Sequence, residues 1–155
     1  MKKVLCIVLV LFFHINAFAL DGKVSHDELI SDTSVKTKIL KGEVFYDDGK
    51  TVTPFFYKGK LNGYGVQYDN DLLHNYYYDL SGNLTQYDVL DRPRNIFPNK
   101  TVSYDANGKI ISYSESYSKS EQVVFNPKGV LIARWIGNVC YDSDGKMLSS
   151  RRELQ

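Results

Sequence analysis

Tyr78-Asp79-Leu80-Ser81-Gly82-Asn83-Leu84 is the first of four copies of a seven-residue phrase on which the predicted fold rests. The shared form is an aromatic residue, Asp or Asn, two free positions, Gly, one free position and a large aliphatic residue. The other copies are Tyr104-Asp105-Ala106-Asn107-Gly108-Lys109-Ile110, Phe125-Asn126-Pro127-Lys128-Gly129-Val130-Leu131 and Tyr141-Asp142-Ser143-Asp144-Gly145-Lys146-Met147. Their glycines lie 26, 21 and 16 residues apart, so the repeat is degenerate.

Each residue type in the phrase suits a β-hairpin turn. The Asp or Asn side chain accepts hydrogen bonds from the amides just ahead of it, which favours a type I turn. Gly can then adopt positive φ without a Cβ clash, and a left-handed residue after a type I turn is typical of a bulged hairpin. Four copies, each between an aromatic and an aliphatic residue, predict a series of antiparallel hairpins. Tyr46-Asp47-Asp48-Gly49 is a shortened fifth copy.

The start of the chain has the parts of a cleavable secretory signal. Met1-Lys2-Lys3 is followed by an apolar run from Val4 to Phe13 and by Ala17-Phe18-Ala19. The apolar run is shorter than the roughly 20 residues of a membrane-spanning helix. We therefore predict a signal peptide at residues 1–19 and export to the periplasm or the extracellular space, with an uncleaved anchor as the alternative.

Charge and cysteine content limit the classes of function. Loss of Lys2 and Lys3 would leave 17 basic against 18 acidic residues, which makes no electrostatic case for nucleic acid as a partner. Cys140 would be the one remaining cysteine. We interpret it as a small apolar strand residue; a reactive thiol or an intermolecular bridge is the alternative.

The segment 20–42 carries the one helical signal. Ser25-His26-Asp27-Glu28 fits a capping box ahead of Leu29. The pattern ends by Asp32-Thr33-Ser34, so we expect a short helix of at most two turns in a partly flexible segment. His26 has no second metal-ligand residue at a usable spacing, so we expect it in solvent.

From Val35 onward the sequence predicts strands, and residues 43–155 are expected to form the β-hairpin repeat domain. Pro54 favours an edge strand or a bulge. Residues 91–100 contain two prolines and predict the longest loop, which either joins two halves of the sheet or lies across one face as a lid.

Two later segments show strand alternation. Ile111, Tyr113 and Tyr117 alternate with serines at 112, 114 and 116, which predicts one packed face and one wet face. Residues 130–136 are largely apolar at both sets of alternate positions, which predicts a central strand. The predicted fold class is all-β: one antiparallel meander of hairpins, as an open curved sheet or a partly closed barrel.

The motifs of catalysis are missing from the sequence. There is no nucleophile elbow, no phosphate-binding Gly loop and no paired-His metal motif, so we expect neither an enzyme nor a cofactor. Asp142-Ser143-Asp144-Gly145 resembles the start of a calcium loop, but it lacks a third ligand before the Gly and a later Glu. We interpret it as ordinary turn chemistry.

Aromatic content is the remaining functional signal. All twelve Tyr residues follow the predicted signal peptide. Exposed Tyr favours recognition of proteins or sugars, although Tyr also covers the faces of a thin sheet. Three consecutive strand residues must alternate in direction, so one Tyr of the triplet should point away from the packed face. The predicted binding surface consists of Tyr76, Tyr77, Tyr78, Tyr113, Tyr117 and Trp135.

One stretch carries a family resemblance. Tyr57-Lys58-Gly59 followed by Asn62-Gly63-Tyr64-Gly65-Val66 resembles a contracted MORN repeat. The Tyr-Asp-x-x-Gly-x-Leu phrases are similar to the looser MORN-like repeats of bacterial antitoxin-type and envelope proteins, and to the YD repeats of large bacterial surface and toxin shells. This resemblance implies a meandering antiparallel sheet used for binding or scaffolding. It implies no catalytic residues.

The expected function is therefore an exported, non-enzymatic protein-binding module that acts as an adaptor, an inhibitor or an immunity-like protein. The expected partner is an envelope or secreted protein. The alternative is a structural or carbohydrate-contacting envelope protein whose edge strands add to a neighbouring sheet.

Export of the chain gives a direct test of the predicted signal. We expect mass spectrometry of the exported product to find Leu20 as its first residue, because Ala17-Phe18-Ala19 provides the small residues of the cleavage site. An exported product that still begins at Met1 would support the anchor instead.

Overall fold

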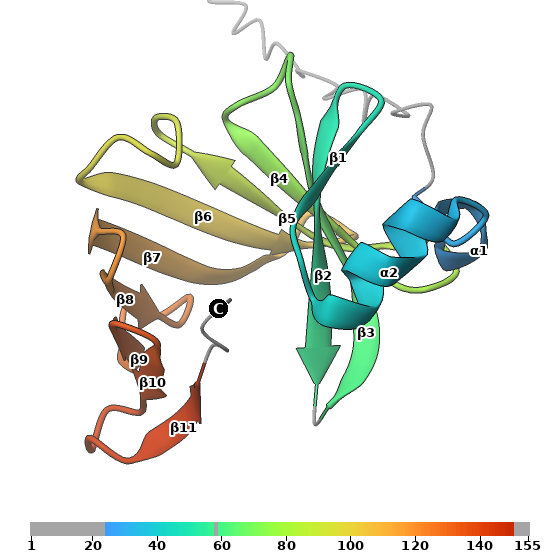
Figure 1. Cartoon of the computed structure of the whole chain (residues 1–155). Coiled ribbons are helices and arrows are strands. Elements are labelled where there is room, and N and C mark those ends of the chain that lie inside the picture. The colour runs from blue at the N-terminus through green and yellow to red at the C-terminus, as the bar shows by residue number, and fades with distance from the viewer. Residues whose placement is uncertain (1–23, 58, 151–155) are drawn as a thin grey trace, which may run out of the picture.

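The computed structural model describes residues 24–57 and 59–150, and it contains one antiparallel sheet in which each strand lies beside its neighbours in the chain (Figure 1). The strands are β1 (Phe45–Asp47), β2 (Lys50–Tyr57), β3 (Lys60–Tyr68), β4 (His74–Tyr78), β5 (Leu84–Leu90), β6 (Asn99–Asp105), β7 (Ile110–Ser118), β8 (Glu121–Phe125), β9 (Leu131–Ile136), β10 (Val139–Tyr141) and β11 (Met147–Ser150). The predicted all-β meander is confirmed. The sheet is open, with β1 and β11 at its edges, and it curls so that β8–β11 turn away from β2–β4 (Figure 1). The predicted signal peptide lies outside the described residues.

The four phrases form the same turn. Asp79 Oδ1 accepts hydrogen bonds from the amides of Ser81 and Asn83, both at 2.9 Å. The Gly82 amide donates to the Asp79 carbonyl at 3.1 Å, and Gly82 has φ 80°. Asp105, Asn126 and Asp142 accept the corresponding two amides in the other copies. Each of these hairpins carries a register shift beside its turn, as predicted for a bulged hairpin.

The repeated turns share one end of the sheet. They join β4 to β5, β6 to β7, β8 to β9 and β10 to β11, and successive antiparallel strands alternate in direction. The shortened copy lies at the opposite end and has a different geometry. Its two-residue turn places Asp48 at φ 38° and Gly49 at φ 73°, and positive φ at both positions is typical of a type I′ turn.

The helical segment is longer than the sequence predicts. Helix α1 (His26–Leu29) begins at Ser25, whose Oγ accepts a hydrogen bond from the Glu28 amide at 3.4 Å, as the capping box predicts. The expectation of strands from Val35 is wrong, because α2 occupies Thr33–Lys41. The β-branched residues of this stretch alternate with lysines, which imitates a strand pattern. Caps and packing override that pattern: Asp32 caps the N-terminus of α2, and Gly42 ends it at φ 72°.

The main hydrophobic core lies between the helices and one face of β1–β4 (Figure 1). Leu29 and Ile39 pack with strand residues that are almost inaccessible to solvent, namely Val52, Tyr64 and Val66. His26 is not in solvent as expected; its Nδ1 is hydrogen-bonded to Tyr64 Oη at 2.5 Å. Burial raises the pKa of Tyr64 to about 12.

Two strand predictions need correction. Ser114, expected on a wet face, is only 8% exposed and accepts a hydrogen bond from Gln122, whereas Ile111 is 38% exposed. Strand β9 has neighbours on both sides, but its side chains alternate between half-buried and exposed, so it is not the doubly packed strand that was predicted. The most buried stretch is residues 63–66 in β3, where the helix-covered core buries Tyr64 and Val66 on one face and neighbouring strands cover the two glycines on the other. Pro54 matches its prediction, since β1 pairs with β2 only as far as Val52.

Replacing Gly129 with Ala tests the left-handed turn position. A Cβ there would meet no atom within 4 Å, so the cost comes from φ 78° alone and should be about 1 kcal/mol of unfolding free energy. Urea unfolding measures it, with Lys128→Ala in the same turn as the control that should change little. Equal stability of Gly129→Ala and the unmodified protein would contradict the assigned turn.

Candidate functional site

The two faces of the sheet differ in chemistry. We call the face that carries Val52, Tyr64 and Tyr76 the helix face, because these residues belong to or pack against the core beneath the helices. The opposite face, which carries Gly65 and Tyr77, is the polar face, since side chains alternate along a strand.

Stacked tyrosines cross the helix face. Tyr76 lies opposite Tyr87, and Tyr87 lies opposite Tyr104. The rings of Tyr87 and Tyr104 stack with centroids 5.0 Å apart and planes 10° apart. Tyr113 follows on β7, opposite Val102. We call Tyr76, Tyr87, Tyr104 and Tyr113 the aromatic row; all four are half-buried.

The aromatic row extends beyond the helices. Tyr76 packs against the helix-covered core, and Leu84 at the start of β5 is the last residue along the chain that does so. Tyr87, Tyr104 and Tyr113, on β5, β6 and β7, are not among the described residues packed against that core, and in Figure 1 the helices lie beside β2–β4. The Tyr87 and Tyr104 rings stack on each other there.

A hydrogen-bonded cluster holds the first ring of the row. The Tyr76 hydroxyl donates to Asp71 Oδ2 at 3.0 Å, and His74 Nδ1 lies 2.7 Å from Asp71 Oδ1. The imidazole also stacks on Tyr76, with ring centroids 6.0 Å apart. Burial acts to raise the pKa of Asp71, but the hydrogen bonds from His74 and Tyr76 outweigh it and lower that pKa. The charged carboxylate therefore fixes the orientation of the Tyr76 ring.

The polar face holds the buried polar side chains of the described residues. These are Asn75, Asp88, Asn99, Ser103 and Ser114, each less than 9% exposed. Register places them on neighbouring strands of one face, since Asn75 lies opposite Asp88 and Asp88 lies opposite Ser103. Asn75 Nδ2 is buried and lacks a hydrogen-bond partner among the described residues.

Phe55 and Tyr77 form an aromatic pair above Gly65 on this face. A Cβ on Gly65 would lie 2.5 Å from Phe55 Cε2, so the ring can lie across β3 only because the residue is Gly. The Phe55 and Tyr77 ring centroids are 5.5 Å apart. The glycines of the MORN-like stretch therefore have different local roles: Gly65 makes room for these rings, Gly63 makes room for the Tyr78 carbonyl, and Gly59 adopts φ 77°.

A buried carboxylate orders the groups around that pair. Asp88 Oδ2 accepts from the Tyr77 hydroxyl at 2.7 Å, and Asp88 Oδ1 accepts from Gln86 Nε2 at 3.1 Å. Burial raises the pKa of Tyr77 well above its usual value, and Asp88 adds to this while Arg94 opposes it. We call Phe55, Tyr77, Gln86, Asp88 and Arg94 the Tyr77 cluster.

Arg94 comes from the long loop between β5 and β6. These two strands are hydrogen-bonded neighbours in one continuous sheet, so the loop does not join separate halves. Asn99, which is 2% exposed, donates from Nδ2 to the carbonyls of Arg94 and Ile96 at 3.3 and 3.0 Å. The loop is therefore anchored to the polar face, which is closer to the second alternative from the sequence.

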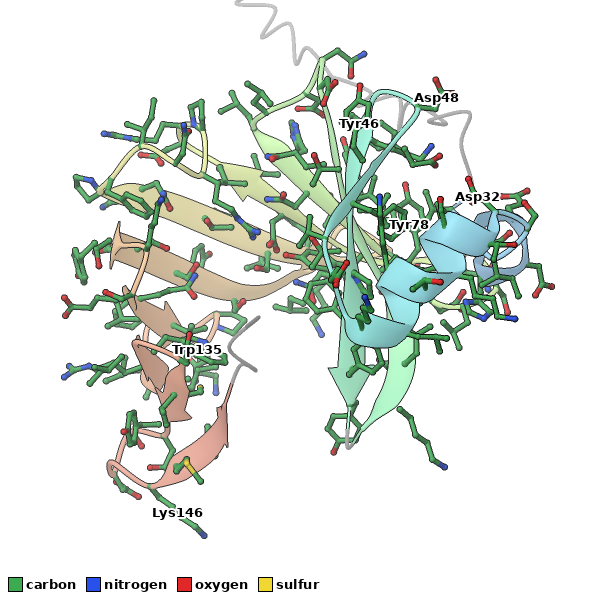
Figure 2. All side chains as sticks on the ribbon, viewed as in Figure 1. Asp32, Tyr46, Asp48, Tyr78, Trp135 and Lys146 are labelled. Atoms are coloured by element: carbon green, nitrogen blue, oxygen red, sulfur yellow. The ribbon has the colours of Figure 1, made fainter. Side chains whose placement is uncertain are left out.

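The six residues of the predicted surface do not lie together. Tyr76 and Tyr113 are on the helix face, whereas Tyr77 and Trp135 are on the polar face, and Tyr78 is buried in the core at 8% exposure. Tyr117 is 47% exposed and donates to Glu115 Oε2. Figure 2 shows Trp135 on the C-terminal strands, far from Tyr78 beside α2. Their role in binding stays a prediction.

Sequence reasoning missed the other members of both sites. Tyr87 and Tyr104 belong to the aromatic row because of strand register. The turn phrases set this register, but its effect extends over several hairpins and is not visible in any one phrase. Asp88 stood outside the turn phrases in a strand, and a lone strand carboxylate was the signal that could have led to the Tyr77 cluster.

The described residues contain no group of three or more His, Cys, Asp or Glu side chains that could hold a metal ion. Neither of the two helices among residues 24–57 and 59–150 is long and apolar enough to cross a membrane. Comparisons of the chain with family models, with curated proteins and with solved structures found no match.

Removal of one hydroxyl tests the buried carboxylate. Tyr77→Phe should lower the unfolding free energy by about 1–3 kcal/mol, because Asp88 loses a donor where water cannot easily replace it. Tyr46→Phe is the matched control: its hydroxyl donates to Asp69 at 2.8 Å on the exposed surface, so its loss should matter less. Equal effects of the two variants in urea unfolding would contradict the assigned burial.

Proposed function

We propose that this protein is an exported, non-enzymatic protein-binding module, of the adaptor, inhibitor or immunity type, and that its partner is an envelope or secreted protein. The observation that carries the proposal is the aromatic row, which continues across the helix face beyond the cover of the helices. Export rests on the predicted signal peptide.

The aromatic row has the physical properties of a recognition surface. Tyr rings offer a large apolar area and a polar hydroxyl, and tyrosines are frequent among the residues that dominate binding energy. Stacking of Tyr87 on Tyr104 and the bond from Tyr76 to Asp71 hold the rings in place before binding. Preorganised side chains lose little conformational entropy in a complex, so more of the contact energy becomes affinity.

The composition of the surface favours a protein over a nucleic acid. The whole chain has a formal net charge of +1, and loss of the signal peptide would reverse its sign. A nucleic-acid site needs a concentration of Lys and Arg, whereas half-buried aromatic and aliphatic side chains are typical of the centre of a protein interface.

Affinity capture with surface variants tests the proposal. Tyr104→Ala should remove capture of a stoichiometric partner from envelope and secreted fractions, because it removes one of the central rings of the aromatic row. Tyr46→Ala is the matched control, since Tyr46 is 62% exposed and lies on the opposite face. Quantitative mass spectrometry would compare both variants with the unmodified protein.

Loss of the partner with Tyr104→Ala and its retention with Tyr46→Ala would support the protein-binding module. Equal capture by both variants would contradict the role of the aromatic row. Retention of the bait on insoluble wall material without an enriched protein would favour an envelope scaffold. Thermal unfolding of each variant would show that the fold is kept.

A further inference from the structure

We propose that the Tyr77 cluster on the polar face is a binding site for a neutral saccharide. This site is separate from the aromatic row, because its side chains point to the opposite side of the sheet. Saccharide binding at this site can therefore be tested independently of the proposed protein partner.

Phe55 supplies the apolar platform of the site. Its ring is 41% exposed although it packs on Tyr77, and Gly65 beneath it lets the ring approach β3 closely. A pyranose ring has one face of C–H groups, and such a face fits an exposed aromatic ring while the sugar hydroxyls project to the side.

Asp88 positions the polar groups beside that platform. Its carboxylate is 6% exposed and accepts from both Tyr77 and Gln86, so it fixes the ring of the first and the amide of the second. Gln86 is half-buried and uses Nε2 for this bond, which leaves Oε1 as an acceptor for a sugar hydroxyl. A rigid amide beside an aromatic platform gives the directional contacts on which recognition of hydroxyls depends.

Arg94, from the long loop, adds a charged donor group near the Tyr77 hydroxyl. The exposed side chain is near enough to the Tyr77 hydroxyl to lower its pKa, and its guanidinium has donors to spare for sugar oxygens. The backbone beneath it is held by Asn99, so the donor group comes from an anchored segment of the loop.

The charges of the Tyr77 cluster narrow the class of ligand. Asp88 and Arg94 carry opposite charges, so the cluster has no net charge and favours a neutral ligand. Asn75 lies directly across the strand pair from Asp88, and its Nδ2 donor lacks a partner among the described residues. Because that Nδ2 is buried, it does not contact a ligand, and the polar contacts to a saccharide come from Gln86 and Arg94.

Titration with two defined probes, cellohexaose and chitohexaose, tests the site in the intact protein. We expect amide NMR signals of Phe55, Tyr77 and Gln86 to shift with at least one probe. Phe55→Ala should weaken that binding at least about fivefold. Phe56→Ala is the matched control: Phe56 is 44% exposed, but its ring lies against Gly42 and not on Gly65.

A second pair of variants distinguishes a specific contribution of Arg94 from the effect of losing any positive charge in the same loop. Arg94→Ala should weaken binding of the same probe, whereas Arg92→Ala should not. The Arg92 guanidinium is paired with the Asp91 carboxylate at 3.1 Å and is not part of the Tyr77 cluster. Tyr104→Ala, on the helix face, should leave saccharide binding unchanged even if it removes the protein partner.

Three results would overturn the site. The first is no shift of any signal with either hexasaccharide at millimolar concentration. The second is a set of shifted signals confined to residues outside the polar face. The third is equal weakening by Phe55→Ala and Phe56→Ala. The first two use the unmodified protein, so the test does not depend on the folding of a variant.

Discussion

Two hydrogen bonds to one side-chain oxygen, repeated in four turns, determine how the rest of the sheet is arranged. Asp79 Oδ1 holds the amides of Ser81 and Asn83, and the later copies repeat the contact. The bond closes a turn of fixed length, and the left-handed Gly places a bulge beside it. Turn length and bulge together set the register of each hairpin, and a slip of one residue would exchange the two faces.

The register separates two kinds of chemistry that are mixed in the sequence. Tyr76 and Tyr77 are adjacent in the chain, yet the first joins the aromatic row and the second contacts Phe55 and Asp88. The helices make the first strands of the sheet different from the later ones. They bury one face of the first strands and leave the later strands with both faces uncovered by any described helix, which is where recognition surfaces can form.

The fold was predictable from local signals, and the sites were not. The turn phrases carry their own geometry in residue types, so the hairpins and the all-β class follow from them. Helix α2 was missed because Val35, Thr37 and Ile39 alternate with lysines like a strand, while the deciding interactions are the caps and the contact with Val52. Contacts that join distant strands, such as Tyr87 with Tyr104, depend on the register of several hairpins at once. Arg94 reaches Tyr77 only through the path of a loop that shows no periodicity.

The repeated turns hold one register and so divide the tyrosines between two faces of the sheet. Proton NMR contacts between side chains test it most directly. We expect contacts of Tyr87 with Tyr104 and of Phe55 with Tyr77, and none between the rings of Tyr77 and Tyr87. A direct Tyr77–Tyr87 ring contact would place both residues on one face and would contradict the assigned strand register.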